Sequence, residues 1–290
     1  MRQTGILPDQ DIAALFEAGA LKSPRVLDTN QIQPASLDLR LGDTAFRVRA
    51  SFLPGPDHLV ADKLDRLKLH EINLAEGAVL ETGCVYIVPL LESLALPSNV
   101  SASANPKSST GRLDIFTRVM TDRGHEFDKI AAGYHGPLYL EVSPRTFPIV
   151  VRAAQDVVDF WEPLYKSGAG ELVLDPDEFY ILVSREAVHV PPLYAAEMTP
   201  FDPLVGEFRV HYAGFFDPGF GHSAAGGSGS RAVLEVRSHE VPFILDHGQI
   251  VGRLVYEHML KRPQALYGSD LGSNYQAQGL KLSKHFRAAR

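Results

Sequence analysis

The tripeptide Leu140-Glu141-Val142 recurs as Leu234-Glu235-Val236, 94 residues further along the chain. Identities at the same shift lie on both sides of it, namely Tyr86-Ile87 and Tyr180-Ile181, Glu92 and Glu186, Pro97 and Pro191, Pro148 and Pro242, and Gln155 and Gln249. Several separated blocks in one register indicate an internal repeat rather than chance. We therefore predict two copies of one domain, in residues 1–166 and 171–290, joined near residues 166–170.

Between about residue 35 and residue 260, short apolar runs alternate with Pro, Gly, Asn and Asp. This pattern is typical of strands in a β-sandwich or barrel, so the chain is predicted to be mostly β. One helix is expected before the first copy, over residues 8–21, with Gly19 at its end. The clearest predicted strands are residues 36–41, where leucine alternates with polar residues, and residues 85–91, 138–142, 149–151, 179–183 and 231–236.

Composition limits the partners of the chain. Its 290 residues are 45% hydrophobic, which allows a substantial core, and its net charge of −7 argues against nucleic acid as a partner. Cys84 is the one cysteine, which excludes a disulfide framework and a multi-cysteine zinc site, and the histidines show no metal-ligand spacing. No apolar run reaches the ~18 residues of a membrane helix, and the N-terminus lacks a signal-peptide core. We expect a soluble, cytoplasmic protein.

The two copies differ at positions where chemistry is expected. The first carries Lys107-Ser108-Ser109-Thr110-Gly111-Arg112, in which hydroxyls, backbone N–H groups and an arginine fork can bind phosphate oxygens. The second carries Asp217-Pro218-Gly219-Phe220-Gly221, a tight-turn sequence with a carboxylate. Each motif alone is also typical of an ordinary surface turn. Because each copy keeps the motif that the other lacks, the pair favours one composite site.

Together these motifs resemble the dCTP deaminase branch of the trimeric dUTP diphosphatase superfamily. The resemblance extends over most of the chain, through the N-terminal helix, Pro34-Ala35-Ser36-Leu37-Asp38-Leu39-Arg40-Leu41-Gly42, the two turns, the Leu-Glu-Val strands and the tail Tyr275-Gln276-Ala277-Gln278-Gly279. It implies two tandem dUTP-diphosphatase-like β-barrel or sandwich domains of the β-clip type, where the usual member has one. It also implies a nucleotide substrate, dCTP or dUTP, and a homo-oligomer, with a homotrimer favoured over a dimer.

The resemblance also implies roles for individual residues. The implied phosphate ligands are Lys107, Ser108, Ser109 and Arg112, and the tail residues that would close over the phosphates are Tyr275 and Gln278. The implied nucleoside contacts are Ala213, Phe216, Asp217 and Gln249. Glu235 is the implied catalytic acid/base, and Glu141 is the second candidate because its own hairpin lacks the aspartate.

The chemistry of hydrolytic deamination fits a glutamate in this role. A water must lose a proton to attack C4 of the cytosine ring, and the proton must then reach N3 and the departing amine. A buried carboxylate with a raised pKa can do both, although a mid-strand glutamate can also simply face solvent. Zinc-dependent deaminases use His-x-Glu with Pro-Cys-x-x-Cys, a site that one cysteine cannot supply. Magnesium is expected to arrive with the triphosphate.

Two further functions stay open from the sequence. A dUTP diphosphatase would use the same phosphate turn and magnesium but direct water to phosphorus, either as the sole activity or combined with deamination. A non-catalytic nucleotide-binding or regulatory protein would carry decayed sites. Glu235 argues against the diphosphatase alone, and the complementary losses argue against decay. We therefore predict zinc-free deamination of dCTP to dUTP and ammonia, which feeds dUMP and dTTP synthesis.

Overall fold

The computed structural model describes residues 4–75, 77–150, 155–156, 164, 171–200, 208–210, 214–238, 241–269, 276, 280–284 and 286–287. The chain divides into two compact units. The N-terminal unit comprises Asp9–Pro106 and Ile115–Arg152, and the C-terminal unit comprises Met1–Pro8, Lys107–Asp114 and Ala153–Arg290. The Lys107–Asp114 segment, which carries the serine-rich turn, therefore packs with the C-terminal unit although it interrupts the sequence of the other.

The described residues of the N-terminal unit include two helices. Helix α1 (Asp9–Glu17) confirms the predicted N-terminal helix but ends earlier than expected, because Gly19 adopts φ +69° and the N–H of Ala20 donates to the carbonyl of Leu15. Helix α2 (Val60–Leu67) was not predicted, although Val60 and Leu64 lie one turn apart and are both buried. The signal for α2 was present in a stretch that was otherwise interpreted as strands and turns.

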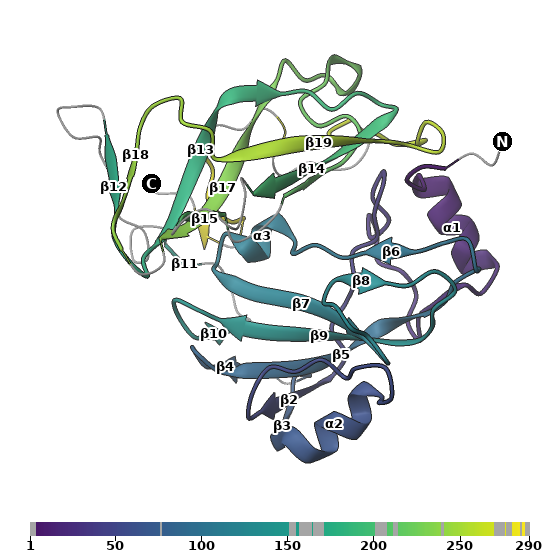
Figure 1. Cartoon of the computed structure of the whole chain (residues 1–290). Helices are drawn as coiled ribbons and strands as arrows, with labels where there is room; N and C mark the ends of the chain where they lie inside the picture. The colour runs from purple at the N-terminus through teal and green to yellow at the C-terminus, as the bar shows by residue number, and fades with distance from the viewer. Residues whose placement is uncertain are drawn as a thin grey trace. The chain divides into compact units, whose positions relative to one another are not determined.

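The strands of the N-terminal unit form one large sheet in the order β3-β2-β5-β9-β7, with β1 also paired to β5 (Figure 1). The same unit contains two separate two-stranded ladders, β4 with β10 and β6 with β8. The strands are β1 (Leu21–Lys22), β2 (Thr44–Val48), β3 (Lys68–Asn73), β4 (Val79–Leu80), β5 (Val85–Ala95), β6 (Ala102–Ser103), β7 (Ile115–Thr121), β8 (Lys129–Ile130), β9 (His135–Pro144) and β10 (Ile149–Val150).

The predicted strand over residues 36–41 is wrong. Leu37 and Leu41 form only isolated bridges, to Ile32 and Leu90. The segment is held instead by the buried carboxylate of Glu92, which accepts hydrogen bonds from the backbone N–H of Arg40 at 2.8 Å and from its Nε at 2.8 Å. A charged side chain thus replaces the backbone ladder, which an alternating sequence pattern does not reveal.

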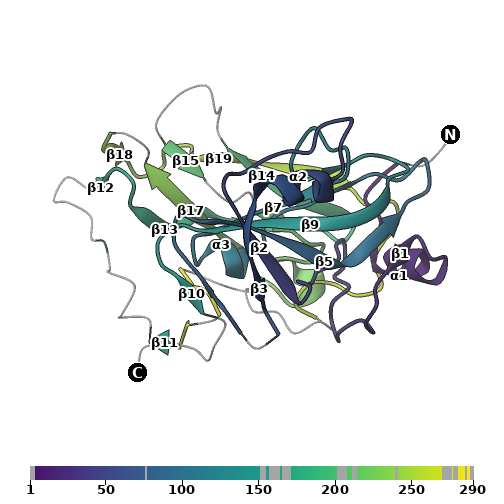
Figure 2. The ribbon, with the colours of Figure 1, turned by 90° about the horizontal axis from the view of Figure 1, so that it is seen from below.

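The strands of the C-terminal unit form several smaller sheets, and β13 and β17 run side by side in it (Figure 2). The orders are β13-β17-β15 and β16-β14-β19, with the ladders β12-β18 and β11-β20. The elements are β11 (Gln155–Asp156), β12 (Leu172–Leu174), β13 (Phe179–Val188), β14 (Tyr194–Pro200), β15 (Phe208–Val210), β16 (Phe215–Phe216), β17 (Ser230–Ser238), β18 (Phe243–Leu245), β19 (Gly252–His258), β20 (Phe286–Arg287), the single turn α3 (Ser108–Gly111) and the 3₁₀ turn η2 (Ser223–Ala225).

The two units repeat the same strand pairing. Glu141 lies opposite Ile87 in the β5–β9 ladder, and Glu235 lies opposite Ile181 in the β13–β17 ladder, 94 residues further along in each strand. Even a side-chain contact recurs at this shift, because the hydroxyl of Tyr86 accepts from the backbone N–H of Glu81 and that of Tyr180 from Asp175. These pairings confirm a mostly β chain built from two copies of one fold.

The hairpins before the two glutamate strands correspond at a different shift. Tyr134 donates its backbone N–H to Ala131, and Phe220 donates to Asp217, so these two turns correspond at a shift of 86 residues. The first copy has the longer hairpin before this turn, and the second copy has residues 222–229 inserted after it. Asp217 of the second copy therefore occupies the position of Ala131 in the first.

Each unit has its own hydrophobic core. In the N-terminal unit α2 covers part of the sheet, and in the C-terminal unit the core gathers around the inward side chains of β17 and the hairpin aromatics. The buried members are Val48, Val60, Leu64, Ile87 and Met120 in the first, and Leu174, Val190, Ala196, Met198, Phe216, Phe220, Ala232, Leu234, Val236 and Leu245 in the second. None of the helices described is long and apolar enough to cross a membrane.

Candidate active site

The serine-rich turn is a single helical turn, α3, followed by a buried arginine. The backbone N–H of Arg112 donates to the carbonyl of Ser108 at 3.0 Å, and its side-chain Nε donates to the Ser108 hydroxyl at 3.1 Å. Arg112 is only 2% exposed, which is rare for an arginine and requires compensation of its charge. The short turn therefore carries a cation into the interior of the C-terminal unit.

Glu235 supplies the opposite charge. It lies in the middle of β17 and is only 3% exposed, and its Oε1 lies 3.6 Å from Nε of Arg112. This is an ion-pair distance, longer than a hydrogen bond, and Oε1 has no hydrogen-bond partner among the described residues. A buried, charged oxygen left without a donor is an acceptor for a substrate group or a water.

Burial also changes the acidity of this carboxyl. Loss of water around Glu235 raises its pKa from 4.5 to about 7, although the positive charge of Arg112 acts in the opposite direction. A group with this pKa exchanges a proton readily near neutral pH. The arrangement can therefore take a proton from water and return it to another atom.

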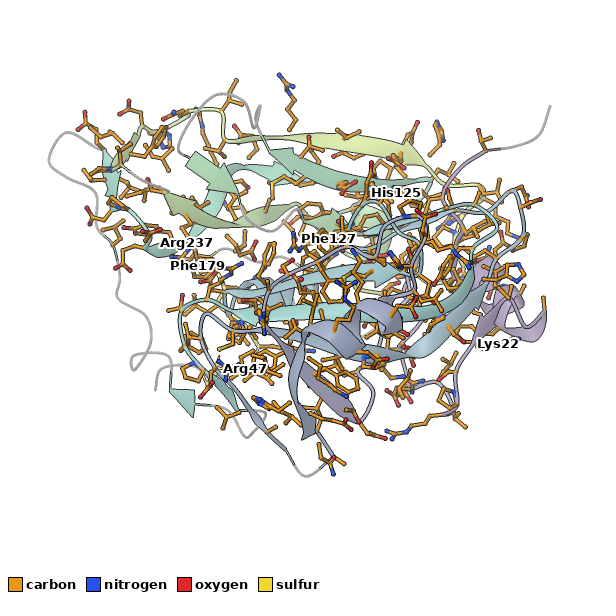
Figure 3. All side chains as sticks on the ribbon, turned by 60° about the horizontal axis from the view of Figure 1, so that its bottom comes forward. Lys22, Arg47, His125, Phe127, Phe179 and Arg237 are labelled. Atoms are coloured by element: carbon orange, nitrogen blue, oxygen red, sulfur yellow. The ribbon has the colours of Figure 1, made fainter. Side chains whose placement is uncertain are left out.

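A second ion pair lies next to the first. Oδ2 of Asp114, at the end of the Lys107–Asp114 segment, accepts a hydrogen bond of 2.5 Å from Nη2 of Arg237 on β17. Arg237 also donates to the carbonyl of Asp177, and its guanidinium lies 5.9 Å from the ring centre of Phe179. Figure 3 shows Arg237 and Phe179 beside each other. The segment is thus attached to β17 at Glu235 and Arg237, two positions on the same side of the strand and opposite to the core residues Leu234 and Val236.

Residues of the C-terminal tail also contact the serine-rich turn. Nη1 of Arg112 donates to the carbonyl of Lys281 at 2.5 Å, and the hydroxyl of Ser283 donates to the carbonyl of Ser109 at 2.8 Å. Both Ser109 and Ser283 are 3% exposed. The tail therefore covers the backbone of the turn. The predicted closure of earlier tail residues over the phosphates is a different contact and stays a prediction.

The predicted nucleoside hairpin lies just before β17. Phe216 is buried in the core, with its ring centre 5.0 Å from that of Phe220, while Asp217 is half-buried at the start of the turn. Gly219 adopts φ +100°, and a Cβ at this position would lie 2.9 Å from Cβ of Leu266 and 3.0 Å from the N–H nitrogen of Tyr267. The turn therefore requires glycine both for its conformation and for its packing.

The remaining predicted site residues are placed as follows. Lys107 is exposed at the start of α3. Gln249 is also exposed, and its side-chain oxygen accepts from the backbone N–H of Asp246 in the same turn. The proposed contacts of these two side chains with nucleotide stay predictions. The other three predicted residues, Ala213, Tyr275 and Gln278, lie outside the residues that the structure describes.

Glu141, the second candidate, has a different environment in the N-terminal unit. Its Oε1 accepts from both Nε and Nη2 of Arg118, at 3.1 and 2.5 Å, and Arg118 lies directly opposite it on β7. Nη2 of Arg118 also donates to the hydroxyl of Ser51. The guanidinium carbon lies 3.6 Å from the ring centre of Phe127, which is labelled in Figure 3. Side chains of the same unit thus occupy the space beside Glu141.

No group of three or more His, Cys, Asp or Glu in the described part of the chain is arranged to hold a metal ion. The prediction that magnesium arrives with the nucleotide and that zinc plays no part stays a prediction.

Sequence reasoning identified Arg112 and Glu235 but not their mutual contact, and it missed four residues around them. These are Asp114, Arg237, Lys281 and Ser283. Asp114 and Arg237 are 123 positions apart and belong to no recognisable motif. Arg237 lies one position beyond the predicted strand over residues 231–236, so no sequence signal indicated it.

Fold and site together define a protein of two similar β-domains with a glutamate carboxyl buried beside an arginine. Two family models match the chain, that of the 2′-deoxycytidine 5′-triphosphate deaminase N-terminal domain over residues 3–160 and that of its C-terminal domain over residues 149–286. The chain belongs to the 2′-deoxycytidine 5′-triphosphate deaminase family.

Individual proteins are similar to the chain in part or over most of its length. The dCTP deaminase of Pectobacterium atrosepticum is 35% identical over 143 residues, which are 47% of this chain and 70% of that protein. The dCTP deaminase of Actinobacillus succinogenes is 34% identical over 144 residues, again 47% and 70% of the two chains. A crystal structure of 2′-deoxycytidine 5′-triphosphate deaminase from Agrobacterium tumefaciens has a TM-score of 0.85 and 62% identity, and the match covers 89% of this chain and 100% of that one.

Proposed function

We propose that the chain hydrolyses dCTP to dUTP and ammonia and that Glu235 is the general acid/base of this reaction. Deamination of dCTP follows from the family and from relatives named for that activity. The role of Glu235 is supported mainly by one observation, the burial of its carboxyl beside Arg112 with a pKa near 7.

The reaction moves two protons, and both come from the attacking water. The Glu235 carboxylate takes a proton from a water molecule as the water oxygen forms a bond to C4 of the cytosine ring. The protonated carboxyl then gives this proton to N3, which relieves the charge of the tetrahedral intermediate. The carboxylate, ionised again, takes the second proton from the new C4 hydroxyl and gives it to the amino group. The C4–N bond then breaks as the C4 carbonyl forms, so that ammonia leaves and the uracil ring keeps the first proton on N3. A carboxyl with a pKa of about 7 serves both directions of transfer.

The resemblance implied a phosphate-binding role for Arg112, but its burial beside Glu235 leads us to propose that it acts beside this carboxyl instead. The guanidinium is 2% exposed and directed at Glu235, Ser108 and the Lys281 carbonyl. In this position its charge lowers the pKa that burial alone would give to Glu235, and thus keeps a useful fraction ionised near neutral pH. The hydroxyl of Ser108 accepts from Arg112, which leaves its own hydrogen for donation to water or substrate.

The triphosphate is proposed to bind at the exposed side of the same turn. Lys107 is the exposed cation there, and magnesium carried by the nucleotide would neutralise the remaining charge. Asp217 would bind the sugar hydroxyl from the neighbouring hairpin. Zinc is not required in this scheme because the water is activated by Glu235, and the one cysteine, Cys84, lies in the N-terminal unit.

The activity is tested by incubating the purified chain with dCTP and magnesium and measuring ammonia and nucleotide products. We expect ammonia and dUTP in equal amounts. Pyrophosphate without ammonia would support the diphosphatase instead, both products together would indicate a bifunctional enzyme, and binding without turnover would support a regulatory protein. Preparations treated with a zinc chelator before magnesium is restored should keep the activity.

The choice between the two glutamates is tested by matched substitutions. Glu235→Gln should abolish ammonia release while dCTP binding is largely retained. Glu141→Gln should keep the activity, because Oε1 of Glu141 already accepts two hydrogen bonds from Arg118. The opposite order of activities would transfer the catalytic role to Glu141.

We further propose that the enzyme acts in the cytoplasm, where its nucleotide substrate is found, and that it forms a homo-oligomer, in preference a homotrimer. Sedimentation of the purified chain at several concentrations measures this state directly.

A further inference from the structure

The Lys107–Asp114 segment meets β17 through two ion pairs of opposite polarity. Arg112 faces Glu235 and Asp114 faces Arg237, so residues two apart on the segment contact residues two apart on the strand. Side chains two apart on a strand point to the same side. A slip of the segment by two residues would place Asp114 at Glu235 or Arg112 at Arg237, and like charges would meet. The two pairs therefore define one register.

Arg237 is fixed independently of the segment. Its Nη1 donates to the carbonyl of Asp177, just before β13, and its guanidinium lies against the ring of Phe179. One terminal nitrogen of the guanidinium, Nη1, is thus bound to the turn before β13, and the other, Nη2, is directed at Asp114. A planar guanidinium held in this way presents its second donor in a fixed direction.

Asp114 is fixed at the other end. Its side chain is buried and its backbone adopts φ +52°, a left-handed conformation that aspartate and asparagine tolerate better than most residues. Its backbone N–H donates to the carbonyl of Gly111 at 2.8 Å, which closes the turn that carries Arg112. The position of the Asp114 carboxylate is therefore coupled to that of the Arg112 side chain through this tight turn, in which one residue separates the two.

The first copy lacks this second pair. Ser143 occupies the position of Arg237, because Val142 and Val236 correspond in the two ladders. Glu141 is bound there by Arg118 from the adjacent strand instead. Among the residues that the structure describes, the second ion pair thus accompanies only the glutamate whose arginine comes from the Lys107–Asp114 segment.

We propose that Asp114 and Arg237 are positioning residues for the deamination, and that their ion pair holds the segment in the register that places Arg112 beside Glu235. This inference rests on the proposed role of Glu235. Neither residue needs to touch the substrate, because both act through the place of the Arg112 guanidinium.

The test compares Asp114→Asn, Arg237→Gln, the double variant and Arg237→Lys in the full chain. Asparagine keeps the shape and the tolerance for φ +52° and removes only the charge. We expect each single variant to lower kcat/KM for dCTP about tenfold or more, since small displacements at a reacting centre have effects of this size. The double variant should be no worse than the worse single one, because both remove the same contact. Arg237→Lys, which keeps the positive charge, should have a higher kcat/KM than Arg237→Gln.

The pH profile separates positioning from folding. Among the described residues, Arg112 is the charged side chain that faces Glu235. If Arg112 moves away, the carboxylate becomes harder to form, so the pH at which kcat/KM reaches half its maximum should rise in Asp114→Asn and Arg237→Gln. A general loss of folded protein lowers the rate at every pH without moving this midpoint. The control is Asp43→Asn, which removes an exposed ion pair with Arg25 in the N-terminal unit and should change neither quantity.

The outcomes are distinct. Wild-type kcat/KM and pH midpoint in both single variants, together with an inactive Glu235→Gln, overturn this inference and leave the proposed function standing. Losses that add in the double variant also overturn it, since independent effects do not come from one contact. An active Glu235→Gln overturns the proposed function and this inference with it. If Asp114→Asn does not fold, kcat/KM and the pH midpoint of Arg237→Gln and Arg237→Lys give the answer, since Arg237 is more exposed than Asp114 and tolerates substitution better.

Discussion

Glu235→Gln tests a property of the fold as well as the reaction. Glutamine has the size and shape of a protonated glutamic acid but cannot lose a proton. The difference in stability between the wild-type chain and this variant therefore isolates the titration of one carboxyl, while all other groups titrate alike in both proteins. Arg112 remains in place beside a neutral side chain in the variant, as it does beside Glu235 at low pH.

The magnitude follows from the pKa. The folded chain holds the Glu235 carboxyl with a pKa of about 7, whereas the unfolded chain releases the proton near the ordinary value of 4.5. Each pKa unit corresponds to about 1.4 kcal/mol, so the full difference is worth about 3 kcal/mol. Below pH 4.5 both states are protonated and this stability is present. As the pH rises toward 7 the unfolded state alone loses the proton, and stability falls; above 7 the loss is complete.

The assay is urea unfolding of both proteins at pH 5 and pH 8.5, followed by circular dichroism at equal protein concentration. We expect the two unfolding free energies to differ little at pH 5. At pH 8.5 the Glu235→Gln variant should be more stable than the wild-type chain by about 2–3 kcal/mol. The inactive variant should thus be the more stable protein under the conditions in which the wild-type enzyme works, which is the usual cost of a buried ionisable group at an active site.

A difference between the two proteins that does not change with pH would refute this reasoning. It would mean that Glu235 has the same pKa in the folded and unfolded chains, and therefore that burial does not tune it for proton transfer. A variant that is less stable at pH 8.5 than at pH 5, relative to wild type, would reverse the sign and assign the carboxylate a stabilising ion pair with Arg112.

Three further outcomes are expected. The kcat/KM of the wild-type enzyme should rise with pH and reach half its maximum near pH 7, since Glu235 must be ionised to accept the first proton; a rate independent of pH between 6 and 8 would contradict its role as base. Arg118→Ala should destabilise the chain by about 3 kcal/mol in urea unfolding because it leaves Glu141 buried without its cation, and Glu141→Gln in the same chain should restore part of this. Gly219→Ala should reduce both stability and dCTP turnover because its Cβ would meet Leu266 and Tyr267. Gly226→Ala is the control, since a Cβ there meets nothing within 4 Å, and its effect should be smaller. Equal effects would show that the loss comes from the positive φ alone and not from packing.

The duplication was visible in the sequence because its signal is distributed over many positions. Strand pairing places Tyr86 and Tyr180, or Glu141 and Glu235, in equivalent registers, and the same residues recur because each copy must fill the same core. The prediction failed where one side chain overrides a pattern. The buried Glu92 organises the segment before β2 through Arg40, and no alternation of apolar residues reports a partner 52 positions away.

The site could be predicted only in part for the same reason. Arg112 and Glu235 each belong to a motif, so their chemical type was evident. Their contact depends on the Lys107–Asp114 segment packing with the unit formed by the C-terminal residues, which no local pattern specifies. Asp114 and Arg237 belong to no motif and could be found only from coordinates.

The two buried glutamates show how one fold position can serve two purposes. Both lie in the middle of equivalent strands, and both have an oxygen without a hydrogen-bond partner among the described residues. Glu141 accepts two N–H bonds on its other oxygen from Arg118, whose guanidinium is in turn stacked on Phe127. Glu235 instead faces its arginine at 3.6 Å without a hydrogen bond at Oε1. Two N–H bonds hold the Glu141 carboxyl in place, whereas Oε1 of Glu235 is left for a water or a substrate group. We therefore propose that the distance of the arginine, rather than the presence of the glutamate, decides which copy is catalytic.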